Sequence, residues 1–204
     1  MVNIEAKDFP VDGLEATGQD VKVHVPKGTA WRFYKLVGDQ DGSITADGDG
    51  DGHACRYGAG VGYAYRYGDG YGNASRDGDG NGHAVRYGAG VGHAYRNGAG
   101  NGDARRDGEG LGHACRYGDG DGHAYRDGDG YGSAYRDGDG DGDAFRYGNG
   151  DGNAFRHGDG NGHAQRGGEG LGNACRWGEG LGNAWRDGAG GGDAHRDGCL
   201  LYTS

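Results

Sequence analysis

The sequence predicts an all-β protein, a β-solenoid in which the strands of successive repeats stack along one axis. The phrase x-Gly-x-Ala-x-Arg-x-Gly-x-Gly recurs in register from Asp51 to Gly190. Its even positions are fixed and its odd positions vary, and a period of two is produced by extended strands, whose side chains alternate between opposite faces. Because ten is an even number, every repeat restarts on the same face without a bulge.

We number the positions of each repeat from one to ten, so that slot one is residue 51, 61 and so on. The fixed Gly and Ala residues predict a thin coil held mainly by backbone hydrogen bonds. We expect one repeat to close one coil, with Gly-x-Gly-x-Gly forming one side and Ala-x-Arg the other. Fifteen such coils at about 4.8 Å each predict a rod of roughly 70 Å.

A second period of thirty residues runs through the aromatic residues of slots seven and five. It indicates either a duplicated segment of three coils, which we favour, or a wide triangular coil of thirty residues. These aromatics are candidates for display on the surface: Tyr57, Tyr87, Tyr117, Tyr147 and Trp177 in one series, and Tyr65, Tyr95, Tyr125, Phe155 and Trp185 in the other.

Residues 1–40 differ from the repeats and predict a small β-hairpin, with strands at 21–25 and 30–37 around the turn at 26–28. A repeat array leaves an open sheet edge at each end, so we interpret this segment as an N-terminal cap. The alternative is a module that attaches the array to something larger. Residues 41–198 are the predicted solenoid, and its first repeat, 41–50, is degenerate.

Composition narrows the possible functions. The chain has 53 Gly, 33% hydrophobic residues and a net charge of −10, so phosphate repulsion disfavours nucleic-acid binding. It has no apolar run long enough for a membrane span, and its first 30 residues show no secretory signal. A surface role outside the cell or on a virion is favoured. We find no set of nucleophile, base and orienting residue, and we expect no enzymatic activity.

The only large residue among the fixed positions is the Arg of slot six. We interpret it as a structural ladder whose guanidinium groups tie neighbouring coils by donating to carbonyls, with acidic residues of the repeats compensating the charge. The alternative is an anion-binding stripe. The ladder comprises Arg56, Arg66, Arg76, Arg86, Arg96, Arg106, Arg116, Arg126, Arg136, Arg146, Arg156, Arg166, Arg176, Arg186 and Arg196.

Calcium is the one possible cofactor, because two acidic runs resemble the opening of a calcium loop: Asp47, Asp49 and Asp51, and Asp137, Asp139 and Asp141. The array superficially resembles the nonapeptide calcium-binding repeats of secreted RTX proteins but differs in its period and its Arg. Solvated turn acids are the simpler interpretation.

The side chains of slots three and five raise two further questions. His residues at slot three form two pairs on adjacent repeats, His83/His93 and His113/His123, which are candidates for sharing a metal or members of a solvated ladder. Cys55, Cys115 and Cys175 are too far apart in a stacked array to form disulfides with one another.

The repeat over 51–198 resembles the Gly-rich decapeptide-repeat proteins of bacteria and tailed phages, for which no activity is established. By analogy we expect a structural surface-display protein, an adhesin or fibre component. One alternative is ice binding, because the array also resembles midge antifreeze proteins, although it lacks their paired Cys. Another is a calcium-binding extracellular repeat protein. The expected partners are a surface glycan, ice or a second copy joined end to end. The final segment, 199–204, resembles a translated sequencing adapter.

Overall fold

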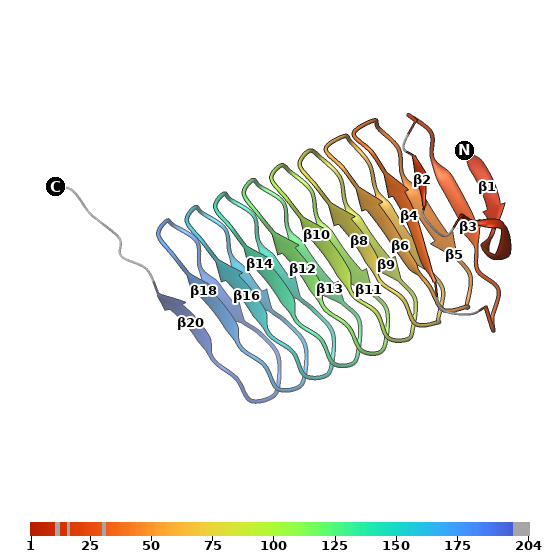
Figure 1. Ribbon diagram of the computed structural model, residues 1–204. Coiled ribbons are helices and arrows are strands. Elements are labelled where there is room, and N and C mark those ends of the chain that lie inside the picture. Colours follow the sequence, from red (N-terminus) through yellow and green to blue (C-terminus); the bar gives the residue numbers. More distant parts are fainter. Residues whose placement is uncertain (11–12, 16, 30–31, 198–204) are drawn as a thin grey trace.

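The protein is a flattened two-sheet β-solenoid (Figure 1). The computed structural model describes residues 1–10, 13–15, 17–29 and 32–197. In the described residues, strands alternate strictly between two parallel ten-stranded sheets, and one 3-10 helix, Ala6–Asp8, follows the first strand. The predicted β-solenoid is therefore confirmed. The segment 199–204 lies outside the described residues.

Odd-numbered and even-numbered strands form separate sheets, which we call the odd sheet and the even sheet. The odd sheet contains β1 (Val2–Glu5), β3 (Val21–His24), β5 (Ile44–Asp47), β7 (Ala64–Tyr67), β9 (Ala84–Tyr87), β11 (Ala104–Asp107), β13 (Ala124–Asp127), β15 (Ala144–Arg146), β17 (Ala164–Arg166) and β19 (Ala184–Arg186). The even sheet contains β2 (Leu14–Glu15), β4 (Phe33–Val37), β6 (His53–Tyr57), β8 (Ala74–Asp77), β10 (Ala94–Asn97), β12 (Ala114–Tyr117), β14 (Ala134–Asp137), β16 (Ala154–His157), β18 (Ala174–Trp177) and β20 (Ala194–Asp197).

Each ten-residue repeat contributes one strand and one turn, but two repeats complete a full turn of the solenoid. Ala94 pairs with Ala74 on one side and with Ala114 on the other, so hydrogen-bonded neighbours are twenty residues apart. The structure thus differs from the expected closure within one repeat, and the alternative of thirty residues per coil is wrong. Ten strands per sheet at about 4.8 Å make the stack roughly 45 Å long, not 70 Å.

The interior explains why a coil needs two repeats. Gly-x-Gly-x-Gly forms a turn and not a second strand, so the Ala-x-Arg strand of one repeat is covered by the Ala-x-Arg strand of the next. Ala134 of the even sheet packs between Ala124 and Ala144 of the odd sheet. A Cβ added to Gly62 would overlap the carbonyl oxygen of Gly42 in the preceding coil and lie 2.8 Å from the Nε of Arg56, so the slot-two Gly leaves room for the stacked backbone and for the opposite Arg side chain.

The interior and exterior follow the predicted even and odd positions. The slot-four Ala residues from Ala54 to Ala174 and the slot-six Arg residues from Arg56 to Arg176 are buried in the described structure. The turns depend on glycine at slots eight and ten, as at Gly118 (φ 104°) and Gly120 (φ 113°). Such positive φ values are strained for residues with a side chain.

A coil of twenty residues also explains the thirty-residue period. A side chain repeated every thirty residues falls on alternate sheets and returns to the same column every sixty residues, three coils later. Cys55, Cys115 and Cys175 show this spacing: all three are on the even sheet, buried and unpaired.

The predicted N-terminal hairpin is not found among the described residues. β3 pairs in parallel with β1 and β5 of the odd sheet, whereas β4 pairs in parallel with β2 and β6 of the even sheet. The two strands predicted as hairpin partners are therefore successive half-turns of the solenoid. Alternating residues indicate a strand but not its partner, which is why the pattern was compatible with both arrangements. The predicted strand at 30–37 begins in the described structure at Phe33, and residues 30–31 lie outside it.

The N-terminal coils replace the Ala and Arg interior with larger apolar side chains. Tyr34 and Leu36 occupy the places of Ala54 and Arg56, and both are buried. Phe9 packs edge-on against Tyr34, with ring centroids 5.4 Å apart. These coils form a conventional hydrophobic core at one end of the stack.

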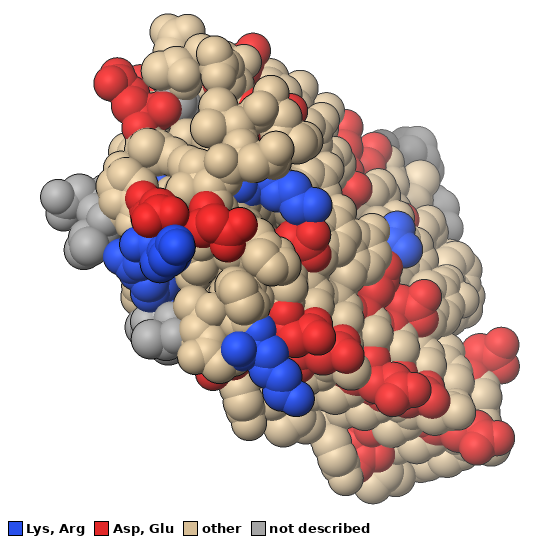
Figure 2. All heavy atoms as spheres, turned by 90° about the vertical axis from the view of Figure 1, so that its right-hand side faces the viewer, with Lys and Arg blue, Asp and Glu red and all other residues tan. Residues whose placement is uncertain are grey.

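Charge is sorted between the inside and the outside. The ladder Arg side chains point inward, so the outward charges of the repeats are mostly Asp and Glu. Figure 2 shows most of the visible Lys and Arg surface at the N-terminal coils and acidic rows along the body. Within the described residues, no helix is long and apolar enough to span a membrane.

The interior predicts a sharp contrast between two Gly to Ala substitutions. Gly112→Ala should lower the thermal midpoint strongly, because the new Cβ would lie 2.0 Å from the carbonyl oxygen of Gly92. Gly167→Ala is the control, since Gly167 occupies an outward slot and its Cβ would meet only the Tyr147 ring, at 2.9 Å. Circular dichroism melts of both variants test this, and equal midpoints would contradict the tight interior.

Candidate ligand-binding groove

The predicted Arg ladder forms two buried ladders, one beneath the turns at each edge of the flattened coil. Arg126 is representative. Its Nη1 donates to the carbonyls of Asp127 and Gly128, at 2.6 Å each. Its Nη2 donates to the backbone carbonyls of Asp129 in its own turn and of Gly110 in the preceding coil, at 3.1 Å each. Each guanidinium thus joins its own turn to the turn of the preceding coil.

Carboxylates do not neutralise these ladders directly, contrary to expectation. Among the described residues, no slot-six Arg forms an ion pair, whereas the outward Arg105 pairs with Asp107 at 2.7 Å. Burial and the neighbouring Arg106 lower the pKa of Arg126 to about 10, so it remains charged at neutral pH. The carbonyl dipoles of the turns are its partners. Because these Arg residues are buried in the coils, they offer no anion-binding stripe on the surface.

Outward polar side chains at slots one, three and nine also bond between coils. Most of the Asp, Asn, His and Ser residues there accept a hydrogen bond from the backbone N–H of the same slot one coil further on. Examples are Asp51 with Tyr71 at 3.0 Å, Asn73 with His93 at 2.8 Å, and Asp79 with Ala99 at 3.0 Å. This requirement for a short acceptor explains why Asp, Asn, His and Ser recur at these slots.

The slot-three His residues belong to this acceptor system. The Nδ1 atoms of His93 and His113 each accept a backbone N–H, at 3.0 Å, which assigns the proton of the neutral ring to Nε2. The predicted pairs His83/His93 and His113/His123 are wrong, because each pair is divided between the two sheets. The neighbours in one column are His93 and His113, whose rings stack at 5.1 Å.

The candidate calcium ligands are used in similar ways. Asp47 pairs with Lys22 at 2.8 Å, while Asp49 and Asp51 accept the N–H groups of residues 69 and 71. Asp139 and Asp141 accept the N–H groups of residues 159 and 161, and Asp137 contacts His157 at 2.9 Å. Within the described part of the chain, no three His, Cys, Asp or Glu side chains converge as a metal site.

The candidate display aromatics alternate between the two faces, and many stack on their neighbours. Tyr67 and Tyr87 stack at 5.2 Å on the odd sheet, and Phe155 and Trp177 stack at 5.5 Å on the even sheet. Most are half-buried; Tyr117 and Trp185 are the exposed members. Rings stacked along the axis present mainly their edges to solvent, so these columns primarily support the coils.

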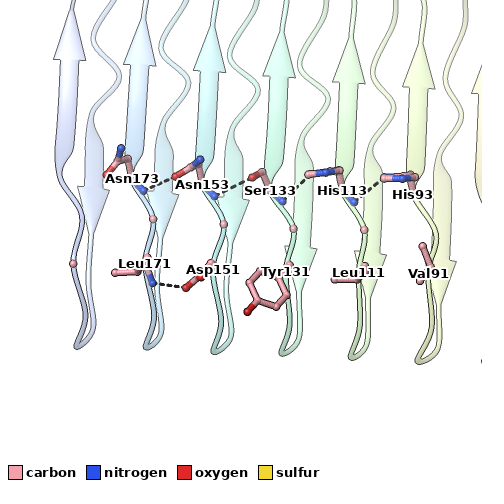
Figure 3. A pocket seen from close by; sticks show the side chains of 15 residues that line it. Val91, His93, Leu111, His113, Tyr131, Ser133, Asp151, Asn153, Leu171 and Asn173 are labelled. Atoms are coloured by element: carbon pink, nitrogen blue, oxygen red, sulfur yellow. Dashed lines mark hydrogen bonds between the residues drawn. The ribbon is translucent and has the colours of Figure 1, made fainter.

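A groove runs along one edge of the solenoid, where odd strands lead into even strands. We call this the groove edge and the opposite one the far edge. Figure 3 shows the two walls, which enclose about 680 Å³. The apolar wall carries Val91, Leu111, Tyr131 and Leu171 at slot one, interrupted by Asp151. The polar wall carries the slot-three residues His93, His113, Ser133, Asn153 and Asn173.

The apolar wall was not singled out from the sequence, although a signal was present. From Tyr71 to Asp141, slot one alternates between a large apolar residue and a polar one: Tyr71, Asn81, Val91, Asn101, Leu111, Asp121, Tyr131 and Asp141. Because alternate repeats belong to the same edge, this alternation places apolar residues along the groove edge and polar residues along the far edge. Leu111, Tyr131 and Leu171 are exposed.

The fold and the groove define a two-sheet β-solenoid repeat protein with one amphipathic edge. Comparison with protein-family models, with curated proteins and with solved structures found no match.

The Arg ladder predicts that Arg126→Lys destabilises the protein although it keeps the charge. A lysine ammonium cannot reproduce the planar fork that reaches four carbonyls, so we expect a loss of at least about 2 kcal/mol. Arg105→Lys, on the outward face of the adjacent strand β11, should leave the free energy of unfolding unchanged. Urea unfolding measures both, and equal stability of the two variants would contradict the ladder.

The slot-three histidines predict a stability that falls with acidity. Burial lowers the pKa of both His93 and His113. The charges of His113 and Arg106 lower the pKa of His93 further, and the charge of Arg126 lowers the pKa of His113 further. A depressed folded-state pKa contributes stability above the unfolded pKa of about 6.5, and this is lost as pH falls through the folded pKa. His123, whose pKa is raised by its hydrogen bond to Asp143, opposes this trend.

The thermal midpoint should therefore be lower at pH 5 than at pH 7.5. The double variant His93→Asn/His113→Asn keeps both acceptors but cannot titrate, so its midpoint should vary less over this range. Asn already occupies the same slot at Asn73 and Asn153. An unchanged pH dependence in the double variant would exclude these two rings as its source.

Proposed function

We propose that this protein is a non-enzymatic surface-display rod, an adhesin or fibre component, that binds saccharides in the groove. The observation that carries the proposal is the amphipathic cross-section of the groove. Its slot-one wall is apolar and exposed, and its slot-three wall is polar, with His, Ser and Asn side chains. A sugar ring has the matching character, with apolar C–H faces and a rim of hydroxyls.

The rigid interior supports a display role. Backbone ladders, buried Arg forks and side-chain acceptors join each coil to the next, so the outward positions are held at fixed spacing. A site built on such elements is preorganised and loses little entropy on binding. The acidic rows along the body favour a neutral partner, because they repel anions.

Tyr131 is the aromatic residue of the groove and 62% of its surface is exposed. Its ring is free of the aromatic stacks found on the sheet faces, so its face is available to a sugar. Amphipathic rings of this kind combine apolar contact with a polar tip at binding surfaces.

The test is binding of the purified protein to a broad glycan panel, followed by titration of the best ligand. Tyr131→Ala should weaken binding by about fivefold or more, since a ring contact contributes roughly 1 kcal/mol. Leu181→Ala is the matched control, because Leu181 has the same slot on the far edge and is 68% exposed. Absence of binding across the panel would refute the proposal.

A further inference from the structure

The backbone of the groove edge carries a feature that the far edge lacks. On the far edge, five consecutive slot-one N–H groups are accepted by the slot-one side chain of the preceding coil, from Asn81 with Asn101 at 3.0 Å to Asn161 with Leu181 at 3.0 Å. Over these five coils the far edge satisfies its own slot-one donors.

The groove edge leaves a run of donors without such an acceptor. The residues that should accept are Tyr71, Val91, Leu111 and Tyr131, whose side chains do not accept these bonds. In the described structure, the N–H groups that follow them have no hydrogen-bond partner within the chain: Val91, Leu111, Tyr131 and Asp151. The run is bounded at both ends by completed pairs, Asp51 with Tyr71 at 3.0 Å and Asp151 with Leu171 at 2.8 Å.

These completed pairs show where a ligand oxygen would lie. In each, a carboxylate oxygen sits between two coils and accepts the N–H of the later coil. A ligand oxygen that reached the N–H group of Leu111 or Tyr131 from the groove would receive the same kind of bond. Four such places follow one another at the coil spacing of about 4.8 Å, along the axis of the solenoid.

From this row of donors we infer that the groove binds an extended, neutral, β-1,4-linked polysaccharide that runs parallel to the axis, with one sugar unit per coil. The inference rests on the proposed saccharide-binding function. Sugar units in such a chain follow one another at close to the coil spacing in alternating orientation, and each offers oxygens on both rims and C–H groups on its faces. The oxygens would accept hydrogen bonds from the four N–H groups, and the C–H faces would lie on Val91, Leu111 and Tyr131.

Other extended ligands fit less well. An extended peptide presents carbonyls on one side only at every second residue, about 6.6 Å apart, so it would fall out of register with the donors. An acidic polysaccharide would be repelled by the acidic rows of the body. The donors themselves are neutral amides and do not require a charged ligand.

The decisive variant is Val91→Asn/Leu111→Asn, which places the far-edge acceptor in the groove. Its side chains should accept the backbone N–H groups of residues 111 and 131 and so compete with the ligand. The matched control is Val91→Ala/Leu111→Ala, which removes the apolar contact but supplies no acceptor. Tyr131 is unchanged in both.

The probes are β-1,4-linked oligosaccharides of glucose and of N-acetylglucosamine with two to six units, titrated by calorimetry. Wild-type affinity should rise with length until about four units cover the four donors. The Asn double variant should bind about tenfold more weakly than the Ala double variant, since a preoccupied donor costs the ligand its hydrogen bond. The Asn variant should also melt at a higher temperature than the Ala variant.

The outcomes separate the two proposals. If the protein binds other glycans of the panel but none of these oligosaccharides, the inference is wrong and the proposed function stands. Equal affinities of the Asn and Ala variants, or an affinity independent of oligosaccharide length, would refute binding by the row of N–H donors. The proposed saccharide binding would still stand. If the protein binds no saccharide at all, both fail.

Discussion

The structure depends on one interaction, the donation of buried guanidinium groups to the carbonyls of stacked turns. A coil made of Ala and Gly is too thin to hold an ordinary core, and its turns leave carbonyl oxygens at both edges. Arg is the side chain that can reach them with several donors from a fixed planar fork. The Gly of slot two fits this arrangement, because a Cβ at Gly62 would overlap the carbonyl oxygen of Gly42 in the preceding coil and crowd the Nε of Arg56. Two repeats per coil follow as well, since each edge needs its own Arg.

The second constraint acts on the outside. Backbone N–H groups at slots one, three and nine need an acceptor from the preceding coil, and short polar side chains supply it, as Asp79 does for Ala99. Most outward Asp, Asn and His residues therefore have a structural role even though they are exposed. A motif such as Asp47-Gly-Asp-Gly-Asp51 resembles a calcium loop because both need short oxygen-bearing side chains at alternate positions. Functional residues are better sought at positions where the side chain does not accept such an N–H group.

The sequence predicted the solenoid, the inward and outward positions and the unpaired Cys residues, because a period of two and the even length of the repeat determine them. It could not distinguish ten from twenty residues per coil, since both are even and place every side chain on the same face. The hairpin error at 21–37 has a similar origin: alternation does not reveal whether the partner strand is parallel. The groove lay beyond the prediction because Val91, Leu111 and Tyr131 become neighbours only when the coil length is known.

The two periods of the chain bear on where function resides. A thirty-residue period combined with a twenty-residue coil places each repeated side chain on both faces in turn, as Tyr57 and Tyr87 are placed. Such residues cannot form a continuous surface on one side. Slot one departs from this pattern, because Tyr71, Val91, Leu111 and Tyr131 alternate with Asn81, Asn101 and Asp121 at the coil period itself. Packing does not require that difference between the edges, since the far edge gains hydrogen bonds that the groove edge forgoes. The groove edge therefore leaves backbone N–H donors open over consecutive coils. A row of open donors is what a binding surface for an extended ligand requires.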